Sequence, residues 1–167
     1  MEKNNETRDL TFLQSLTLVV ILSGVLAVLA YLILQGGRFY GLFVLACAIV
    51  PVVGAKLVRL KLQRLIPDIL FGSIDTGLLT VAALIGAAGF GVIGAIVGGV
   101  IGDAITDGIA GFFEGGISEW LRRHGIDESR TALGSCFGKT TGCLLGSGLV
   151  LFLASVAGVG QTILVSK

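Results

Sequence analysis

Five apolar segments, each long enough to cross a lipid bilayer, limit the folds open to this chain. A transmembrane helix needs about 20 predominantly apolar residues. The segments are residues 11–34, 39–57, 67–88, 92–117 and 132–164. Mean hydropathy is +0.95 over 167 residues, and only 14% of them are charged, which is typical of polytopic membrane proteins. We therefore predict one all-α transmembrane domain over residues 1–167, with five helices.

The distribution of basic residues predicts the orientation of these helices. Every second connection between the segments is basic. These connections, together with the residues before the first segment, contain Lys3, Arg8, Lys56, Arg59, Lys61, Arg64, Arg122, Arg123 and Arg130. Because basic connections stay on the cytoplasmic side, we predict the N-terminus inside and the C-terminus outside. The run at 11–34 exceeds the ~7–15 apolar residues of a signal-peptide core, so we expect a retained helix.

Carboxylates occur inside these apolar segments. Asp75, Asp103 and Asp107 lie within the third and fourth segments, and Asp68 and Glu114 lie near the ends of the same two. A charged side chain at the bilayer centre costs about 2.5–3.5 kcal/mol on insertion scales. A bound cation, a proton or a fixed positive partner would offset this cost. The pattern therefore favours the handling of cations or protons.

The spacing of the acids predicts matching depths on two antiparallel helices. Asp75 follows Asp68 by seven residues and Asp107 precedes Glu114 by seven, a rise of about 10 Å in each helix. Asp103 lies one turn deeper than Asp107. We predict a metal site formed by Asp68, Asp75, Asp103, Asp107 and Glu114, with further oxygen atoms from Ser73, Thr80 and Thr106. Carboxylate and hydroxyl oxygens suit hard divalent cations, and Mn²⁺ or Fe²⁺ are also compatible.

Two other interpretations stay open. Lys139, about 10 Å into the fifth segment, would tune the site or form a structural salt bridge with Asp75 or Asp107, although one lysine cannot neutralise three aspartates. The second interpretation is an enzyme that acts on lipid headgroups, because residues 103–110 partly match the Asp-rich motif of CDP-alcohol phosphotransferases. The first spacing of that motif differs here, and Gly111 replaces its arginine. We predict no catalytic or cofactor-binding residue.

Glycine rows indicate close helix packing. They are Gly94, Gly98 and Gly102 in the fourth segment and Gly134, Gly138, Gly142 and Gly146 in the fifth. Small residues at this spacing let helices touch backbone to backbone. The rows would pack the fourth and fifth helices together or join copies of the chain. Since five helices hardly enclose a polar path, we predict a homo-oligomer in the lipid bilayer. With no basic stripe, we predict no nucleic-acid partner.

Part of the chain resembles the vacuolar iron transporter family. The resemblance covers residues 72–123 and rests on the motif Ser-Ile-Asp-Thr-Gly-Leu-Leu-Thr at 73–80 and on Gly-Phe-Phe-Glu-Gly at 111–115. In that family a helix opening with an Asp-Gly element precedes a helix ending in a Gly-Glu turn. The resemblance implies five helices with the N-terminus inside, and it assigns the metal to Asp75 and Glu114. It also implies that a divalent cation is the substrate.

Overall fold

The computed structural model describes residues 12–35, 40–125 and 131–158, where every regular element is an α-helix. The helices are α1 (Phe12–Gln35), α2 (Tyr40–Cys47), α3 (Ile49–Leu57), α4 (Leu62–Arg123) and α5 (Ala132–Val156). Four helical stretches are long and apolar enough to cross a membrane: Phe12–Gln35, Tyr40–Leu57, Leu62–Phe113 and Ala132–Val156. The all-α prediction is confirmed for the described residues.

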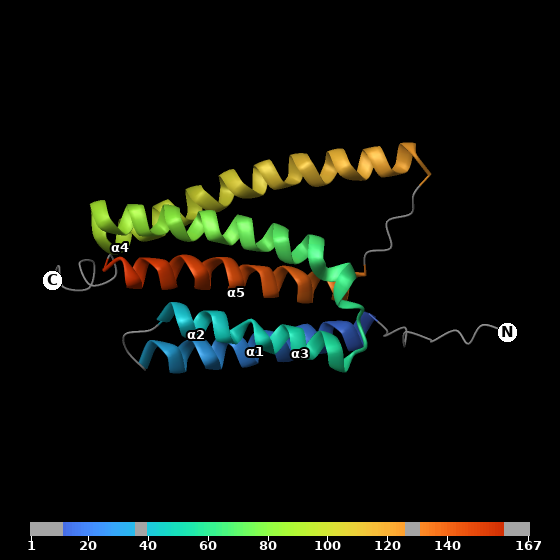
Figure 1. Ribbon diagram of the computed structural model, residues 1–167, viewed down its shortest axis with the longest axis horizontal. Coiled ribbons are helices and arrows are strands. Elements are labelled where there is room, and N and C mark those ends of the chain that lie inside the picture. Colours follow the sequence, from blue (N-terminus) through green and yellow to red (C-terminus); the bar gives the residue numbers. More distant parts are fainter. Residues whose placement is uncertain (1–11, 36–39, 126–130, 159–167) are drawn as a thin grey trace.

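Helix α4 contains both the third and the fourth predicted segments. Its 62 residues would measure about 93 Å if straight, roughly three times the hydrocarbon core of a bilayer. The chain turns back at Phe90 (φ −136°, ψ 16°) and Gly91 (φ 61°, ψ −142°). Residues 62–89, here the first arm, and residues 92–123, the second arm, therefore run antiparallel (Figure 1). The positive φ explains the glycine at position 91, because glycine adopts it without steric cost.

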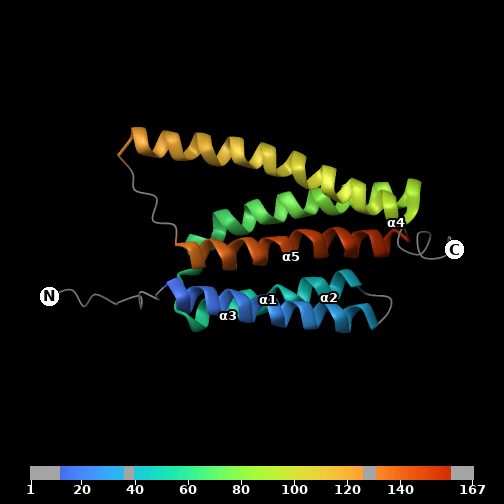
Figure 2. The same ribbon diagram turned by 180° about the vertical axis from the view of Figure 1, so that it is seen from behind.

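Helix α5 lies between two layers of the bundle. The first arm of α4 covers one side of it, and α1, α2 and α3 cover the other (Figures 1 and 2). Within the described residues neither α1 nor α2 contacts α4. The second arm lies outside the first arm and separates from it toward its own C-terminal end. The first arm is thus the element that joins the second arm to the rest of the bundle.

Among the described residues, the basic residues of the α3–α4 connection and of the end of the second arm lie at one end of the bundle. The start of α1, the α3–α4 connection and the end of the second arm share this end, and the bend of α4 and the end of α5 lie at the other (Figure 1). We call them the basic end and the bend end. The side chains of Lys56, Arg59, Lys61, Arg64 and Arg123 are exposed.

The second predicted segment is divided in the structure. The prediction was one helix over residues 39–57, but α2 ends at Cys47 and α3 begins at Ile49. Pro51 has no N–H to donate to the carbonyl of Cys47, and its ring crowds that group. The break therefore falls one turn before the proline. At this point Ala48 N–H donates to the Leu45 carbonyl, at 3.1 Å.

Helix α4 is longer at both ends than the predicted segments. It begins at Leu62, five residues before the predicted start at residue 67. Because Pro67 has no N–H, the carbonyl of Gln63 loses its helical hydrogen bond. Both residues are exposed, so water can satisfy that carbonyl. At the other end the helix passes residue 117 and continues to Arg123. An exposed i,i+4 pair between Arg123 and Glu119, at 3.8 Å, lies in this extra turn.

Helix α5 ends earlier than the predicted residue 164. Its last helical residue is Val156, and Gly158 follows with φ 77°. A glycine with positive φ just after a helix is a common terminator, so the helix stops here. The predicted residues 159–164 lie outside the described part of the chain.

Both glycine rows pack against the first arm of α4. A Cβ on Gly98 would lie 2.5 Å from the Ala82 carbonyl oxygen, and Gly94 is in direct contact with the Gly86 backbone. From α5, a Cβ on Gly142 would lie 2.9 Å from Ser73 N. The predicted contact between the two rows is therefore wrong, because each row faces a different side of the same arm.

A small apolar core lies toward the basic end. Its buried members are Leu22, Ala55, Leu65, Leu133 and Phe137, which come from α1, α3, α4 and α5. A Cβ on Gly54 would lie 2.6 Å from the ring of Phe137. This cluster links the layer of α1 and α3 to α5 and to the start of the first arm.

The glycine contacts predict a difference in stability between two substitutions. A Cβ at Gly142 would collide with the backbone of Ile69 and Ser73, whereas at Gly108 nothing lies within 4 Å. We expect Gly142→Ala to lower the free energy of unfolding by about 1–3 kcal/mol, and Gly108→Ala to leave it unchanged or raise it. Thermal unfolding in detergent, followed by circular dichroism, measures both. Equal stability of the two variants would contradict the close packing of α5 on the first arm.

Candidate cation site

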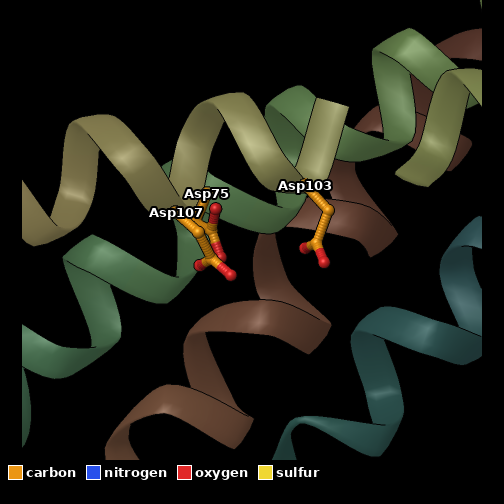
Figure 3. A group of neighbouring side chains, drawn as sticks. All are labelled: Asp75, Asp103 and Asp107. Carbon is orange, nitrogen blue, oxygen red and sulfur yellow. The ribbon is translucent and has the colours of Figure 1, made fainter. Parts of the chain in front are cut away.

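Three of the predicted acids come together where the arms of α4 run side by side. Asp75 belongs to the first arm, and Asp103 and Asp107 belong to the second (Figure 3). One carboxylate oxygen from each lies within 4.8 Å of the others. All three carboxylates project to the same side of the arm pair (Figure 3). The residues are up to 32 positions apart in the sequence, so the bend of α4 creates the cluster.

The antiparallel register of the arms explains this meeting. Next to the bend Gly94 faces Gly86, and one turn further Gly98 faces Ala82. Each turn away from the bend on one arm is thus matched by one turn on the other. Continued for two more turns, this register brings the second arm at Asp103 and Asp107 beside Asp75. These two acids are spaced i,i+4, which places them on one face of the helix.

The oxygen separations suit a single metal ion. Oxygens on opposite sides of Ca²⁺ lie about 4.6–5.2 Å apart, because each bond is about 2.3–2.6 Å long. For Mg²⁺ the same separation is about 4.0–4.2 Å. The observed limit of 4.8 Å therefore admits a larger divalent ion directly, and a smaller one after slight closure. Three carboxylates leave coordination positions for water.

Electrostatic repulsion requires a compensating charge at this cluster. Two unit charges separated by 4.8 Å repel by about 3.5 kcal/mol at an effective dielectric constant near 20. Three ionised carboxylates contain three such pairs, and the surrounding helices are apolar. A cation bound between the three carboxylates would offset this repulsion.

Asp75 has an unusual environment within the cluster. Its side chain is half-buried, and the buried Oδ1 atom has no hydrogen-bond partner within the described part of the chain. Asp103 and Asp107 are exposed on the second arm. An isolated buried carboxylate oxygen is costly without a partner. A cation between Asp75 and the two exposed acids would supply one.

Of the other predicted acids, Asp68 is not part of this group. Asp68 is buried on the first arm, and a Cβ on Gly138 of α5 would lie 2.6 Å from its Cβ. It therefore packs toward α5. Glu114 belongs to the helical backbone of the second arm, and its side chain lies outside the described part of the structure. Its predicted pairing in depth with Asp68 stays a prediction.

Lys139 lies near the first arm. It is exposed on α5, and its Nζ is 5.9 Å from the centre of the Phe71 ring, a cation–π contact. Phe71 precedes Asp75 by one helical turn. A Cβ on Gly72 would lie 2.8 Å from the Lys139 carbonyl oxygen, so the two backbones touch. The structure thus places a positive charge beside Phe71, one turn from Asp75, and the predicted role of Lys139 stays a prediction.

The predicted hydroxyl ligands bond to helix carbonyls. Ser73 donates to the Ile69 carbonyl at 2.7 Å, and Thr106 donates to the Asp103 carbonyl at 3.1 Å. Thr80 donates to the Thr76 carbonyl at 2.7 Å and lies 2.9 Å from the hydroxyl of Ser147 on α5. Sequence reasoning did not single out Ser147. The available signal was a serine between two glycines inside an apolar segment.

No family model, no curated protein and no solved structure matches this chain. The resemblance to the vacuolar iron transporter family therefore stays a prediction from the sequence.

The cluster predicts divalent-cation binding that depends on its three acids. We expect Asp107→Asn in detergent to weaken Mn²⁺ binding by roughly tenfold or more, which is at least about 1.4 kcal/mol, because one of three charged ligands is lost. Glu119→Gln is the matched control, since Glu119 is an exposed acid on the same arm that pairs with Arg123. Isothermal titration calorimetry measures both. Equal affinity of the two variants would exclude Asp107 as a ligand.

Proposed function

We propose that this protein is a multi-pass membrane transporter for a divalent cation, and that Asp75, Asp103 and Asp107 bind the ion within the membrane. The observation that carries the proposal is the convergence of three carboxylates, from two arms of one apolar helix, within 4.8 Å. Acids inside transmembrane helices usually mark ion or proton pathways. A site this negative needs positive charge, and a divalent cation supplies it with few ligands.

We also propose that each arm of α4 crosses the membrane separately, which gives five crossings. The stretch Leu62–Phe113 has 52 residues, more than twice the roughly 20 that one crossing needs. The bend at Phe90 and Gly91 would then lie near one membrane surface. The basic end would face the cytoplasm, because exposed lysines and arginines gather there. This assignment puts the N-terminus inside and the C-terminus outside.

In this arrangement the cation reaches the cluster from the cytoplasmic side. Asp75 lies 13 residues after the start of α4, or about 20 Å along the helix, which is well inside the membrane. Asp68 lies about 10 Å nearer the basic end, and Glu114 occupies the matching level on the second arm. These two acids would form the cytoplasmic mouth, as the sequence indicates. Proton exchange at the aspartates would allow coupling between cation and proton movement.

Flux in proteoliposomes tests the transport function. We expect Mn²⁺ entry, followed with an enclosed metal-sensitive dye, to fall to the level of empty liposomes for Asp107→Asn, since the site loses a charged ligand. Glu119→Gln should retain the wild-type rate. A rate that changes with an imposed pH gradient would indicate proton coupling, and an unchanged rate would indicate a uniporter or channel. Full transport by correctly folded Asp107→Asn would contradict the proposal.

The position of Lys139 supports a second candidate, a structural ion-pair network. Its ammonium group lies over Phe71, one turn from Asp75. If Lys139 only neutralises the acids, Asp107→Asn and Lys139→Met should each destabilise the fold, since each leaves an uncompensated charge. The double variant should then recover part of the loss, a coupling of about 0.5–3 kcal/mol. Unfolding in detergent measures this cycle, and additive effects would exclude the structural network.

A further inference from the structure

The two arms of α4 are in close contact between the cluster and the bend end. A Cβ on Gly98 would lie 2.5 Å from the Ala82 carbonyl oxygen, and one on Gly102 would lie 2.8 Å from the Ala82 Cβ. A hollow of about 520 Å³ runs along this seam, but its lining contains no polar side chain, and the second arm has none over residues 92–102. This seam therefore lacks the side-chain oxygen atoms that a cation would need.

The seam between the first arm and α5 is different, because it contains hydroxyl groups. Thr80 is buried and lies 2.9 Å from Ser147 of α5, oxygen to oxygen. Ser147 also lies 3.4 Å from the Thr76 carbonyl oxygen. Past Asp75, Thr76 and Thr80 are the polar side chains of the first arm. Thr80 lies about 7–8 Å beyond Asp75 toward the bend end.

In the proposed function the ion enters the cluster from the basic end. Asp103 and Asp107 are exposed, and the arms separate toward the basic end (Figure 1). On the other side of the cluster, the seam between the two arms has an apolar lining, whereas the seam between the first arm and α5 contains the contact between Thr80 and Ser147. These hydroxyls are therefore the side-chain oxygens available to an ion that continues toward the bend end.

We propose that the ion leaves toward the bend end along the seam between the first arm and α5, and that the contact between Thr80 and Ser147 closes this route. The inference rests on the proposed transport function and names the exit path of the same site. A partly dehydrated divalent cation needs oxygen ligands along its way. The hydroxyls of Thr80 and Ser147 and the carbonyl of Thr76 supply them once α5 moves away.

The contacts at this level of the seam can open without breaking a covalent or ionic link. A Cβ on Gly77 would lie 3.8 Å from the Gly146 backbone, an ordinary van der Waals distance. At this level the two elements also make the hydroxyl contact between Thr80 and Ser147. Both neighbours of the first arm pack on it through glycines, but the two arms of α4 are in addition joined covalently through the bend. We therefore expect α5 and the first arm to separate while the arms of α4 stay together.

A disulfide lock tests the exit route. Thr80→Cys and Ser147→Cys are introduced after Cys47, Cys136 and Cys143 are replaced by alanine. The replaced oxygens are 2.9 Å apart, so the sulfurs must approach by only about 1 Å to reach the ~2.05 Å bond length. After oxidation with diamide we expect loss of Mn²⁺ flux, retention of Mn²⁺ binding, and recovery of flux with dithiothreitol.

The control lock joins the two arms of α4. A Cβ on Gly99 would lie 3.8 Å from the Ala83 Cβ, which matches the mean separation of about 3.8 Å in disulfides. Oxidised Ala83→Cys, Gly99→Cys should therefore keep its flux. Flux that persists in fully oxidised Thr80→Cys, Ser147→Cys would overturn the exit route. Loss of flux in both locked proteins would overturn it too, because the arms would then also have to separate.

A variant pair without cysteine gives an independent reading. The double variant Thr80→Val, Ser147→Ala removes both hydroxyl oxygens and nearly preserves the shape of the side chains. We therefore expect unchanged Mn²⁺ binding and reduced Mn²⁺ flux. Wild-type flux would contradict the exit route. Failure of the transport function would look different, because the reduced protein would then bind Mn²⁺ without moving it. Loss of Mn²⁺ binding in the oxidised lock would contradict a third point, the entry of the ion from the basic end.

Discussion

The close approach of the first arm of α4 to its two neighbours is the contact on which the rest of the structure depends. Glycines of the second arm touch its backbone on one side, and glycines of α5 touch it on another. In a bilayer there is little hydrophobic gain when helices associate, so van der Waals contact between small residues supplies much of the attraction. The two glycine rows thus hold three helical segments at backbone distance.

This packing has an electrostatic consequence. A register fixed by contacts near the bend extends along both arms, and it carries three acids to one place. Acids in separate helices would each face lipid at a cost. Brought together, they repel one another unless positive charge enters the site. The same glycines that pack the hairpin therefore bring the three acids together.

Much of this could be read from the sequence. The apolar runs, the turn near Gly91, the basic connections and the acids within the spans depend on local composition and on a fixed helical rise. The depth match of Asp75 with Asp107 followed from counting residues. The errors were also local in origin. The effect of Pro51 falls on the turn before it, and helix α4 continues through residues 118–123 because no glycine or proline interrupts it there.

The sequence by itself determined that the chain is helical and apolar, and that three acids lie inside its apolar segments. Tertiary structure alone decided which faces meet. Asp68 turns out to pack on α5 at Gly138, the glycine rows share one partner, and Ser147 meets Thr80 across 67 residues. Helical periodicity fixes the face of each residue on its own helix. Which neighbour covers that face depends on how the side chains of distant segments fit, and no local pattern contains that information.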